Sequence, residues 1–374
     1  MDKIIVVMPT YNEVDNIGRM IDMLCMEIFP LIKGIKMGVL VVDDNSPDET
    51  GKVVKGRMRK YENVFLLSGQ KKGLGYAYVR GMRFAMDHLH ADAIIEIDAD
   101  FQHPPILVKS LVDAYLRGAD CVMGSRYIRG GSVPKEWALY RRFISFFGNF
   151  LIRLCFPGEK IHDYTTGFRL TRVNGVLGTI ELEKLRSLDR FASKVDLLNQ
   201  IMRRSRKVVE VPLKFVLRER EVSKFNAAEI IETLRIAFAI GLQRYYGFLK
   251  FGMIGFFGYF VNAVTLWFFT KMMFPSVLAW TFSTEISILN NFFLNNIWTF
   301  RERRVKGMKQ WFSKMVKFHY LTVSAVILQI LLGVFSDYLL GEEYRQISLP
   351  IIILALFPYK YVLSKKFIWR TDNK

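Results

Sequence analysis

Residues 93–102 read AIIEIDADFQ, a short β-branched run that is followed by two carboxylates and an amide. We predict a buried strand over residues 93–97, because β-branched side chains favour strands and a strand covered on both faces is apolar along its length. Ligands of sheets that carry helices on both faces bind at the carboxyl ends of the strands. Asp98, Asp100 and Gln102 therefore stand where a ligand site is expected.

Three similar apolar runs precede this stretch and alternate with helical patterns. Strands are predicted over residues 4–8, 39–42 and 64–67, with one helix from about residue 13 and another over residues 74–89. Such alternation predicts an α/β fold, Rossmann-like, with a mostly parallel sheet between layers of helices. The segments PTYNE and DDNSPD follow the first two runs, so we expect them at the same edge of the sheet as DADFQ.

The composition changes after about residue 245, where long uncharged stretches begin. The first holds 20 uncharged residues, 251–270, and the next, between Lys271 and Arg301, carries a single charge at Glu285. About 20 apolar residues suffice to span a bilayer. We predict four helical spans, at about residues 250–270, 276–299, 318–337 and 346–363, in a transmembrane domain over residues 247–374.

The charged loops predict the orientation of these spans. Residues 301–317 carry seven basic side chains and one acidic one, and the C-terminal tail is basic as well. Positive charge near the ends of spans marks the cytoplasmic side. We therefore expect a multi-pass protein of the cell membrane, with the domain that precedes the spans and both termini in the cytoplasm.

The overall composition excludes several classes of protein. Hydrophobic residues make up 51% of the 374, too many for a disordered chain. Three cysteines without a CxxC pair exclude a disulfide framework or a cysteine-rich zinc site. Much of the formal charge of +18 lies in segments that flank the spans, which argues for a lipid bilayer and against nucleic acid as a partner.

Residues 226–246 connect a first domain, over residues 1–225, to the spans. Their apolar positions recur at helical spacing, with Glu229, Glu232 and Arg235 off the apolar face. Such a helix either packs in the core of the first domain or lies at the membrane interface. The position just before the first span favours the interface.

Asp98, Asp100 and Gln102 form a set of hard oxygen ligands within five residues. Mg²⁺ and Mn²⁺ take a few protein oxygens and complete their coordination with substrate phosphates and water. Acidic pairs also occur in solvated turns, but the position directly after an apolar strand favours a cation site. We predict Mg²⁺ or Mn²⁺ as the cofactor.

Several motifs together resemble a known family. Residues 1–225 resemble a family 2 inverting glycosyltransferase of the GT-A fold, and within it the dolichol-phosphate mannose synthase group. The similar segments are VVMPTYNEVDNI, VVDDNSPDET, KKGLGYAYVRGMRFA, DADFQHPP, GSRYIRGG, YRRFIS and TTGFR. The C-terminal part resembles a GtrA-like membrane domain of four helices, through EISILNNFF and NIWTF.

The resemblance implies roles for residues at matching positions. Asp100 and Gln102 would hold the metal ion. Contacts to the nucleotide sugar are implied for Pro9, Tyr11, Glu13, Val42, Asp44, Asp98, Ala99, Asp100, Gln102, Arg126, Arg220 and Lys224. Contacts to an acceptor phosphate are implied for Arg126, Arg141 and Ser145, which with Asp100 form the implied catalytic set. Glu221 departs from the group, which usually has glycine at that position.

The acceptor of such an enzyme explains why this set includes no general base. A lipid phosphate has a second pKa of about 6 and is largely dianionic at neutral pH. It can therefore attack the anomeric carbon without first losing a proton. Arginines suit the binding of such a phosphate, because a guanidinium can bond it bidentately.

We accordingly predict a membrane-bound transferase that moves mannose from GDP-mannose to dolichyl (polyprenyl) phosphate, with inversion to dolichyl β-D-mannosyl phosphate. The same reaction with UDP-glucose or another UDP-hexose stays open, because no residue identifies the base. The absence of a QxxRW segment disfavours a processive polysaccharide synthase. A different class would be a non-catalytic GT-A anchor whose helices translocate lipid, against which the intact Asp98, Asp100 and Gln102 argue.

Overall fold

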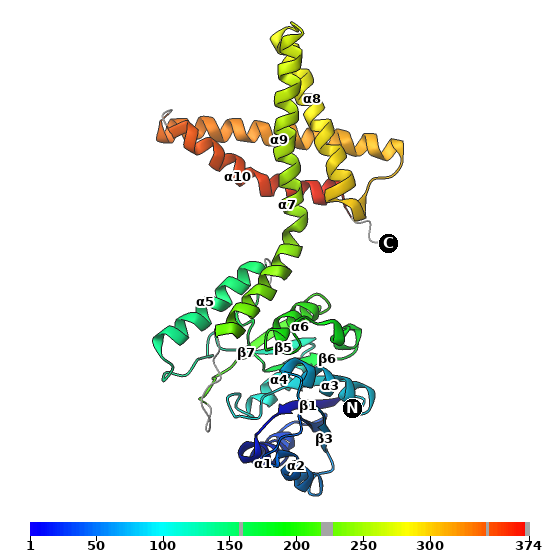
Figure 1. The fold of residues 1–374 in the computed structure, drawn as a ribbon, viewed down its shortest axis with the longest axis vertical. Coiled ribbons are helices and arrows are strands. Elements are labelled where there is room, and N and C mark those ends of the chain that lie inside the picture. The colour runs from blue at the N-terminus through cyan, green and yellow to red at the C-terminus, as the bar shows by residue number, and fades with distance from the viewer. Residues whose placement is uncertain (157–159, 218–226, 342–343, 371–374) are drawn as a thin grey trace. The chain divides into compact units, whose positions relative to one another are not determined.

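The computed structural model describes the chain except for residues 157–159, 218–226, 342–343 and 371–374. The chain forms two compact units, Met1–Gly241 and Leu242–Lys374 (Figure 1). The first unit contains a sheet covered by helices, and the second unit is helical. The boundary between the units falls inside the connecting segment predicted at residues 226–246.

The centre of the first unit is a mixed sheet. Its strands are β1 (Lys3–Thr10), β2 (Lys36–Asp43), β3 (Val64–Ser68), β4 (Ala93–Glu96), β5 (Cys121–Ser125), β6 (Arg169–Arg172) and β7 (Val208–Pro212). In the described part of the chain they lie in the order β3-β2-β1-β4-β6-β5-β7. The first four strands are parallel, whereas β6 runs antiparallel to β4 and β5. The predicted mostly parallel α/β fold and its four strands are therefore confirmed.

Alternate residues of β1 serve the two faces of this sheet. The helices of the first unit are α1 (Val14–Asp22), α2 (Thr50–Met58), α3 (Leu74–Asp87), α4 (Leu107–Leu116), α5 (Leu139–Cys155), α6 (Ser193–Met202) and the start of α7 (Ala227–Lys271). Ile5 and Val7 belong to a core with α3 and α6, while Ile4, Val6 and Met8 belong to a core with α1, α2 and α4. Each fully buried side chain of this size contributes about 1.5–3 kcal/mol.

The amphipathic helix predicted at residues 226–246 is the beginning of the longer helix α7. Within the first unit, Ile236, Ala237 and Ile240 are buried in the core, so one face of the helix packs there. Ile231 and Phe238 are 66% and 64% exposed on the remaining surface. The membrane-interface interpretation concerns that exposed surface and stays a prediction.

The second unit is built from long apolar helices. They are the C-terminal part of α7, α8 (Ser276–Leu294), α9 (Met308–Leu340) and α10 (Arg345–Leu363). In the described chain, three segments are long and apolar enough to cross a membrane: Tyr245–Lys271, Met308–Leu340 and Arg345–Ile368. They include the spans predicted at residues 250–270, 318–337 and 346–363. The remaining prediction, residues 276–299, contains α8, whose serine, threonine, asparagine and glutamate residues lower its apolarity.

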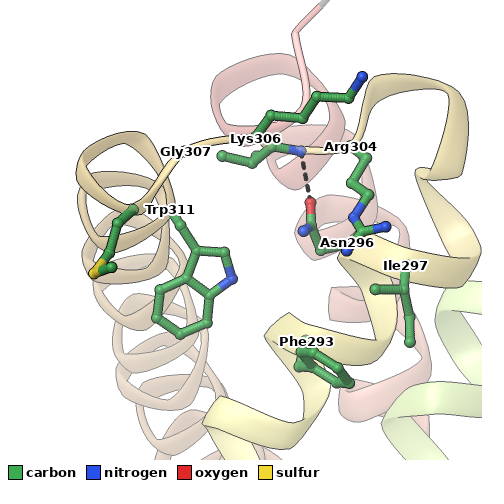
Figure 2. A pocket seen from close by; sticks show the side chains of 9 residues that line it. Phe293, Asn296, Ile297, Arg304, Lys306, Gly307 and Trp311 are labelled. Atoms are coloured by element: carbon green, nitrogen blue, oxygen red, sulfur yellow. Dashed lines mark hydrogen bonds between the residues drawn. The ribbon is translucent and has the colours of Figure 1, made fainter.

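Asn296 of the NIWTF motif joins two segments of the second unit. Its Oδ1 accepts hydrogen bonds from the Val305 amide at 2.8 Å and from the Trp369 indole at 3.1 Å. Trp369 also stacks on Phe300, with ring centroids 4.3 Å apart. The NIWTF motif therefore holds the loop at Val305 and the C-terminal Trp369 against the end of α8. Figure 2 shows the bond to Val305 beside a pocket of about 490 Å³, lined by Phe293, Asn296, Ile297, Arg304, Val305, Lys306, Gly307, Met308 and Trp311.

A buried ion pair joins β4 to β6. Glu96 and Arg169 are partners in the antiparallel ladder, and the guanidinium bonds the carboxylate through Nε and, at 3.0 Å, through Nη2. Neither side chain is more than 2% exposed. Burial disfavours the charged guanidinium, but the carboxylate of Glu96 outweighs burial and raises the pKa of Arg169. Arg169 also donates to the Lys194 carbonyl at 3.2 Å, so the pair connects both strands to α6.

Removing one member of this pair would leave the other buried without compensation. We expect Arg169→Leu to lower the free energy of unfolding by about 3–5 kcal/mol, and the double variant Glu96→Leu/Arg169→Leu to recover most of that loss. The matched control is Arg83→Leu, which breaks the more exposed pair with Glu183 and should cost less than about 1 kcal/mol. Denaturant unfolding of the full-length protein in detergent measures these changes, and equal losses in both single variants would contradict the assignment.

Candidate active site

Hydrogen bonds connect the loops that follow β1 and β2 at the carboxyl edge of the sheet. The Asn12 amide donates to Ser46 Oγ at 3.0 Å, and Ser46 Oγ in turn donates to Asp43 at 2.6 Å. Asp48, from the second loop, accepts the Val14 amide at the start of α1 at 3.0 Å. Because β2, β1 and β4 are neighbours, the segments PTYNE, DDNSPD and DADFQ meet at one edge, as predicted.

The same edge has an unusual backbone. Asn12, Asn45, Glu49 and Phe101 adopt left-handed conformations, with φ between 52° and 71°. Such conformations cost about 1–3 kcal/mol for residues with a side chain, and they gather at functional sites. Phe101 stands between Asp100 and Gln102, so the backbone is strained within the turn where the metal ligands are predicted.

Several of the residues predicted to contact a nucleotide sugar line up at this edge. Pro9 and Val42 are register partners near the ends of β1 and β2. The Lys71 ammonium lies 3.4 Å from the centroid of the Tyr11 ring, which places a cation over that aromatic face. Ala99 is 3% exposed between the two aspartates of DADFQ. The contacts of these residues with a nucleotide stay a prediction.

Asp44 and Glu13, also predicted for the nucleotide, both have partners in the chain. Arg80 Nη2 donates to Asp44 Oδ1 at 2.7 Å, and a Cβ at Gly69 would lie 2.3 Å from Arg80 Nη1. Burial raises the pKa of Asp44, although Arg80 opposes that effect. Glu13 accepts a hydrogen bond from Asn16 Nδ2 at 2.9 Å. Gly69 therefore leaves room for the arginine that holds Asp44.

Asp98 is surrounded by donors. Tyr78 donates its hydroxyl to Oδ1 at 2.9 Å, the Lys194 ammonium lies 3.5 Å from the same oxygen, and His103 Nδ1 lies 3.7 Å from Oδ2. Burial raises the pKa of Asp98, but Lys194 and then His103 outweigh burial, so the pKa falls below its ordinary value. Burial lowers the pKa of His103 despite Asp98, so its imidazole is neutral at pH 7.

Lys194 is the buried cation of this cluster. Its side chain is 3% exposed, and its ammonium makes no hydrogen bond to any residue that the structure describes. It lies 4.6 Å from the centroid of the Tyr78 ring. A Cβ at Gly167, within the TTGFR segment, would lie 2.2 Å from Lys194 Nζ. The glycine therefore makes space for an ammonium that faces Asp98.

Asp100 and Gln102 lie in one tight turn. The Gln102 amide donates to Asp100 Oδ1 at 3.1 Å, and Asp100 is 2% exposed. The Gln102 carbonyl accepts the Val216 amide at 3.2 Å, which fixes the far side of the turn. Across residues 1–374 apart from the undescribed ones, no cluster of three or more His, Cys, Asp or Glu side chains forms a metal site. The chemistry of a carboxylate plus an amide oxygen fits a divalent cation that takes its other ligands from phosphate and water.

Arg126 forms a buried, bidentate pair with Asp163. Nε and Nη2 of the guanidinium bond the two carboxylate oxygens at 2.7 Å each, and Nη2 also bonds Thr165 at 2.7 Å. Burial opposes its charge, but Asp163 raises the pKa of Arg126 above its ordinary value. Its Nη1 makes no hydrogen bond to any residue that the structure describes.

Ser145 and Arg141 both lie on α5. Ser145 Oγ and the Tyr127 hydroxyl are 2.6 Å apart, and Asn149, one turn further along, bonds both the Ser145 carbonyl and Thr165. Through Thr165 this network reaches Arg126. The Arg141 guanidinium lies 4.0 Å from the Trp137 ring centroid, a cation–π contact. The three predicted acceptor residues are thus brought together around the start of α5.

Phe215 connects the two halves of the candidate site. Its ring lies 5.3 Å from the His103 ring and 5.8 Å from the Trp137 ring, between centroids. The Arg126 guanidinium lies 5.5 Å from the same ring. The Asp98 cluster and the arginine cluster are therefore neighbours across a single aromatic side chain.

The sequence analysis did not single out Tyr78, Lys194, Trp137 or Phe215. One usable signal was Lys194 itself, the single cation of the mostly apolar helical stretch FASKVDLL. Phe215 carried no such signal, because an aromatic residue near the end of a strand is ordinary. Arg220, Glu221 and Lys224 lie outside the described residues.

The fold and this site define a glycosyltransferase of the GT-A type that continues into a helical membrane domain. Residues 5–176 match the model of glycosyl transferase family 2, and residues 250–369 match that of the GtrA/DPMS transmembrane domain. Over its whole length the chain is similar to the dolichol-phosphate mannosyltransferase of Pyrococcus furiosus, 33% identical over 374 residues, with 99% of this chain and 100% of that protein covered. The chain belongs to the dolichol-phosphate mannosyltransferase family, which confirms the resemblance seen in the sequence.

Other similar proteins cover about two thirds of the chain. The undecaprenyl-phosphate mannosyltransferase of Micrococcus luteus is 33% identical over 233 residues, covering 62% of this chain and 91% of that protein. Among solved structures, glucosyl-3-phosphoglycerate synthase from Mycobacterium tuberculosis is 20% identical with a TM-score of 0.44, over 65% of this chain and 80% of that chain.

The charge of Lys194 sets the protonation of Asp98, which gives a test by pH. A carboxyl with a lowered pKa stabilises the fold above about pH 4, and this stabilisation is lost as the pH falls through the folded-state pKa. We expect Lys194→Met to raise the pKa of Asp98, so that the variant loses stability at a higher pH than the natural protein. Thermal unfolding between about pH 3 and pH 7 measures this. Lys184→Met, which removes an exposed lysine paired with Glu181, should leave the profile unchanged. Coincident profiles for both variants would contradict the assignment.

Proposed function

We propose that this protein transfers mannose from GDP-mannose to the phosphate of dolichol or a related polyprenol, with inversion at the anomeric carbon. The observation that carries the proposal is the arrangement around Phe215, which sets the carboxylate and amide turn next to the arginine cluster. The membrane spans of the same chain support a lipid acceptor. The names of the relatives from Pyrococcus furiosus and Micrococcus luteus support a polyprenyl-phosphate mannosyltransferase.

The donor would bind at the carboxyl edge of β1, β2 and β4. A divalent ion, Mg²⁺ or Mn²⁺, held by Asp100 and Gln102 would neutralise the charge that develops on the leaving nucleoside diphosphate. Asp98 is ionised at neutral pH and can accept hydrogen bonds from sugar or ribose hydroxyls. Asp44, held by Arg80, keeps its second oxygen for the ribose or the base.

The acceptor phosphate would bind between Arg126, Arg141 and Ser145. Because a lipid phosphate is largely dianionic at neutral pH, its oxygen attacks the anomeric carbon directly, and no base has to remove a proton. Asp163 compensates the charge of Arg126, so this arginine offers an oriented N–H group, Nη1, rather than a net charge. Arg141, supported on Trp137, would supply the charge that the phosphate meets.

We further propose that the catalytic domain and both termini face the cytoplasm of a cell membrane protein. The basic segment 301–317, between α8 and α9, supports this orientation, provided that α8 also crosses the bilayer. Glu285 is the one charged residue of α8, and its Oε2 lies 3.5 Å from His319 Nδ1. A partner of this kind lowers the cost of a carboxylate within a span.

The donor is tested by offering labelled GDP-mannose and UDP-glucose in parallel, with a short polyprenyl phosphate and Mg²⁺ or Mn²⁺. We expect label in the lipid phase from GDP-mannose. Label from UDP-glucose alone would leave the proposed residue roles unchanged and show that the donor is UDP-glucose and not GDP-mannose. No label from either donor would favour the non-catalytic interpretation of the domain.

The acceptor site is tested with two neighbouring arginines. We expect Arg141→Gln to lower kcat/KM for the lipid phosphate about 10- to 100-fold, the loss of one or two charge-assisted hydrogen bonds. Arg142→Gln, one residue further along α5 and exposed, should change it less than about threefold. Similar losses in both variants would point to a general effect of charge instead of a phosphate contact.

The metal ligands are tested by substitution and chelation together. We expect Asp100→Ala to abolish transfer while the protein stays folded in the membrane, and EDTA to abolish transfer by the natural protein until Mg²⁺ or Mn²⁺ is restored. Asp113→Asn, an exposed carboxylate paired with Lys109, is the control and should retain activity. Full activity of Asp100→Ala in EDTA would overturn the metal assignment.

A further inference from the structure

The second unit contains a cavity that is lined by none of the residues assigned to the candidate active site. It has a volume of about 520 Å³ and is bounded by residues of α7, α8, α9 and α10. Most of its wall is apolar and includes Phe251, Phe256, Phe318 and Phe357. All of its lining residues lie between positions 251 and 360, within the second unit.

Two asparagines that line this cavity carry buried hydrogen-bond acceptors. Asn295 lines it and is only 2% exposed. Its Nδ2 donates to the Asn291 carbonyl at 2.7 Å, which fixes the orientation of the amide. Oδ1 of Asn295 has no hydrogen-bond partner in the described chain. Asn291 also lines the cavity, and its Oδ1 is likewise buried without a hydrogen-bond partner there. Buried oxygens of this kind need a hydrogen-bond donor.

The cavity also holds a cation without a carboxylate. Lys360 lines it, and no aspartate or glutamate is among its lining residues. The Lys360 ammonium lies 5.6 Å from the centroid of the Phe318 ring, and no described acid pairs with it. An anion would therefore be attracted to this end of the cavity.

We propose that this cavity binds a lipid whose headgroup carries both a phosphate and hydroxyl groups. The phosphate pairs with Lys360, the hydroxyls donate to the amide oxygens of Asn291 and Asn295, and the chain lies against the aromatic wall. A phosphate alone has only acceptor oxygens at neutral pH, so it leaves the two amide oxygens unsatisfied. The lipid product of the proposed reaction, a glycosyl phosphate, has this chemistry, and so does phosphatidylglycerol. The choice of product rests on the proposed function, whereas the cavity's chemistry does not.

Glycines give a matched pair of variants that tests the cavity. Gly255 lines it, and a Cβ built there meets no atom within 4 Å, so Gly255→Leu fills the cavity without a backbone clash. Gly333 on α9 is equally free of neighbours but does not line the cavity, so Gly333→Leu is the control. For the charge, Lys360→Gln is compared with Lys366→Gln, an exposed lysine further along the chain.

The probe is a mannosyl-phosphoryl isoprenoid with a photoreactive diazirine near the phosphate. Full-length protein in phosphatidylcholine nanodiscs is labelled, and the attachment sites are mapped by peptide mass spectrometry. We expect label at cavity residues of α7, α9 and α10, reduced about tenfold or more in Gly255→Leu and Lys360→Gln, and unchanged in the two controls. Because the probe is supplied ready-made, failure of the transferase assay does not affect this result.

Competition then separates the two sources of the headgroup. Displacement by unlabelled mannosyl-phosphoryl lipid, but not by phosphatidylglycerol or polyprenyl phosphate, supports the reaction product. Equal displacement by phosphatidylglycerol supports a bulk phospholipid at the same site. Label spread evenly over the outer surfaces of the spans, or cavity label that is unchanged in Gly255→Leu, would overturn the proposal. Equal displacement by polyprenyl phosphate would overturn the role of the hydroxyl groups.

Discussion

The candidate active site depends on the buried contact between Glu96 and Arg169. β4 ends at Glu96, two residues before Asp98, and β6 begins at Arg169, two residues after Gly167. The pair therefore fixes the strand that leads into the carboxylate turn against the strand that leads out of the TTGFR segment. Arg169 also holds the Lys194 carbonyl, so the same guanidinium positions the backbone of the lysine that faces Asp98. A buried pair of this kind contributes little net stability, but it is costly to break, and so it defines one arrangement of three segments that are distant in the sequence.

Much of the first unit could be predicted from the sequence, because its first half is built from local patterns. The runs over residues 4–8, 39–42, 64–67 and 93–97 are apolar on both faces, as parallel strands between helices must be. β6 and β7 lack that pattern: β6 reads RLTR and β7 reads VVEVP, so neither is a continuous apolar run. The predicted site loops meet because β2, β1 and β4 are neighbours in the sheet. The proximity of Lys194 and Phe215 to the site cannot be predicted from local patterns, because only tertiary packing brings α6 and the segment after β7 to the same place.

The membrane part shows a different limit. Length and lack of charge identify three of the four predicted spans, whereas the polar residues of α8 make that helix ambiguous by composition alone. The structure gives some of those polar residues partners inside the second unit: Ser287 donates to the Gly258 carbonyl at 2.7 Å, and His319 faces Glu285. Hydrogen bonds between helices cannot be read from a hydropathy pattern. They explain how a helix with so many polar side chains can pack among apolar ones.

The balance of charge at the active site bears on the need for a metal ion. Asp98 and Asp100 contribute two carboxylates, Lys194 contributes one ammonium, and burial keeps His103 neutral. Arg126 is already compensated by Asp163, so it does not change this balance. Among Asp98, Asp100, His103 and Lys194, the carboxylates therefore outnumber the charged ammonium by one. Bringing two phosphates there is unfavourable unless a divalent cation reverses that charge.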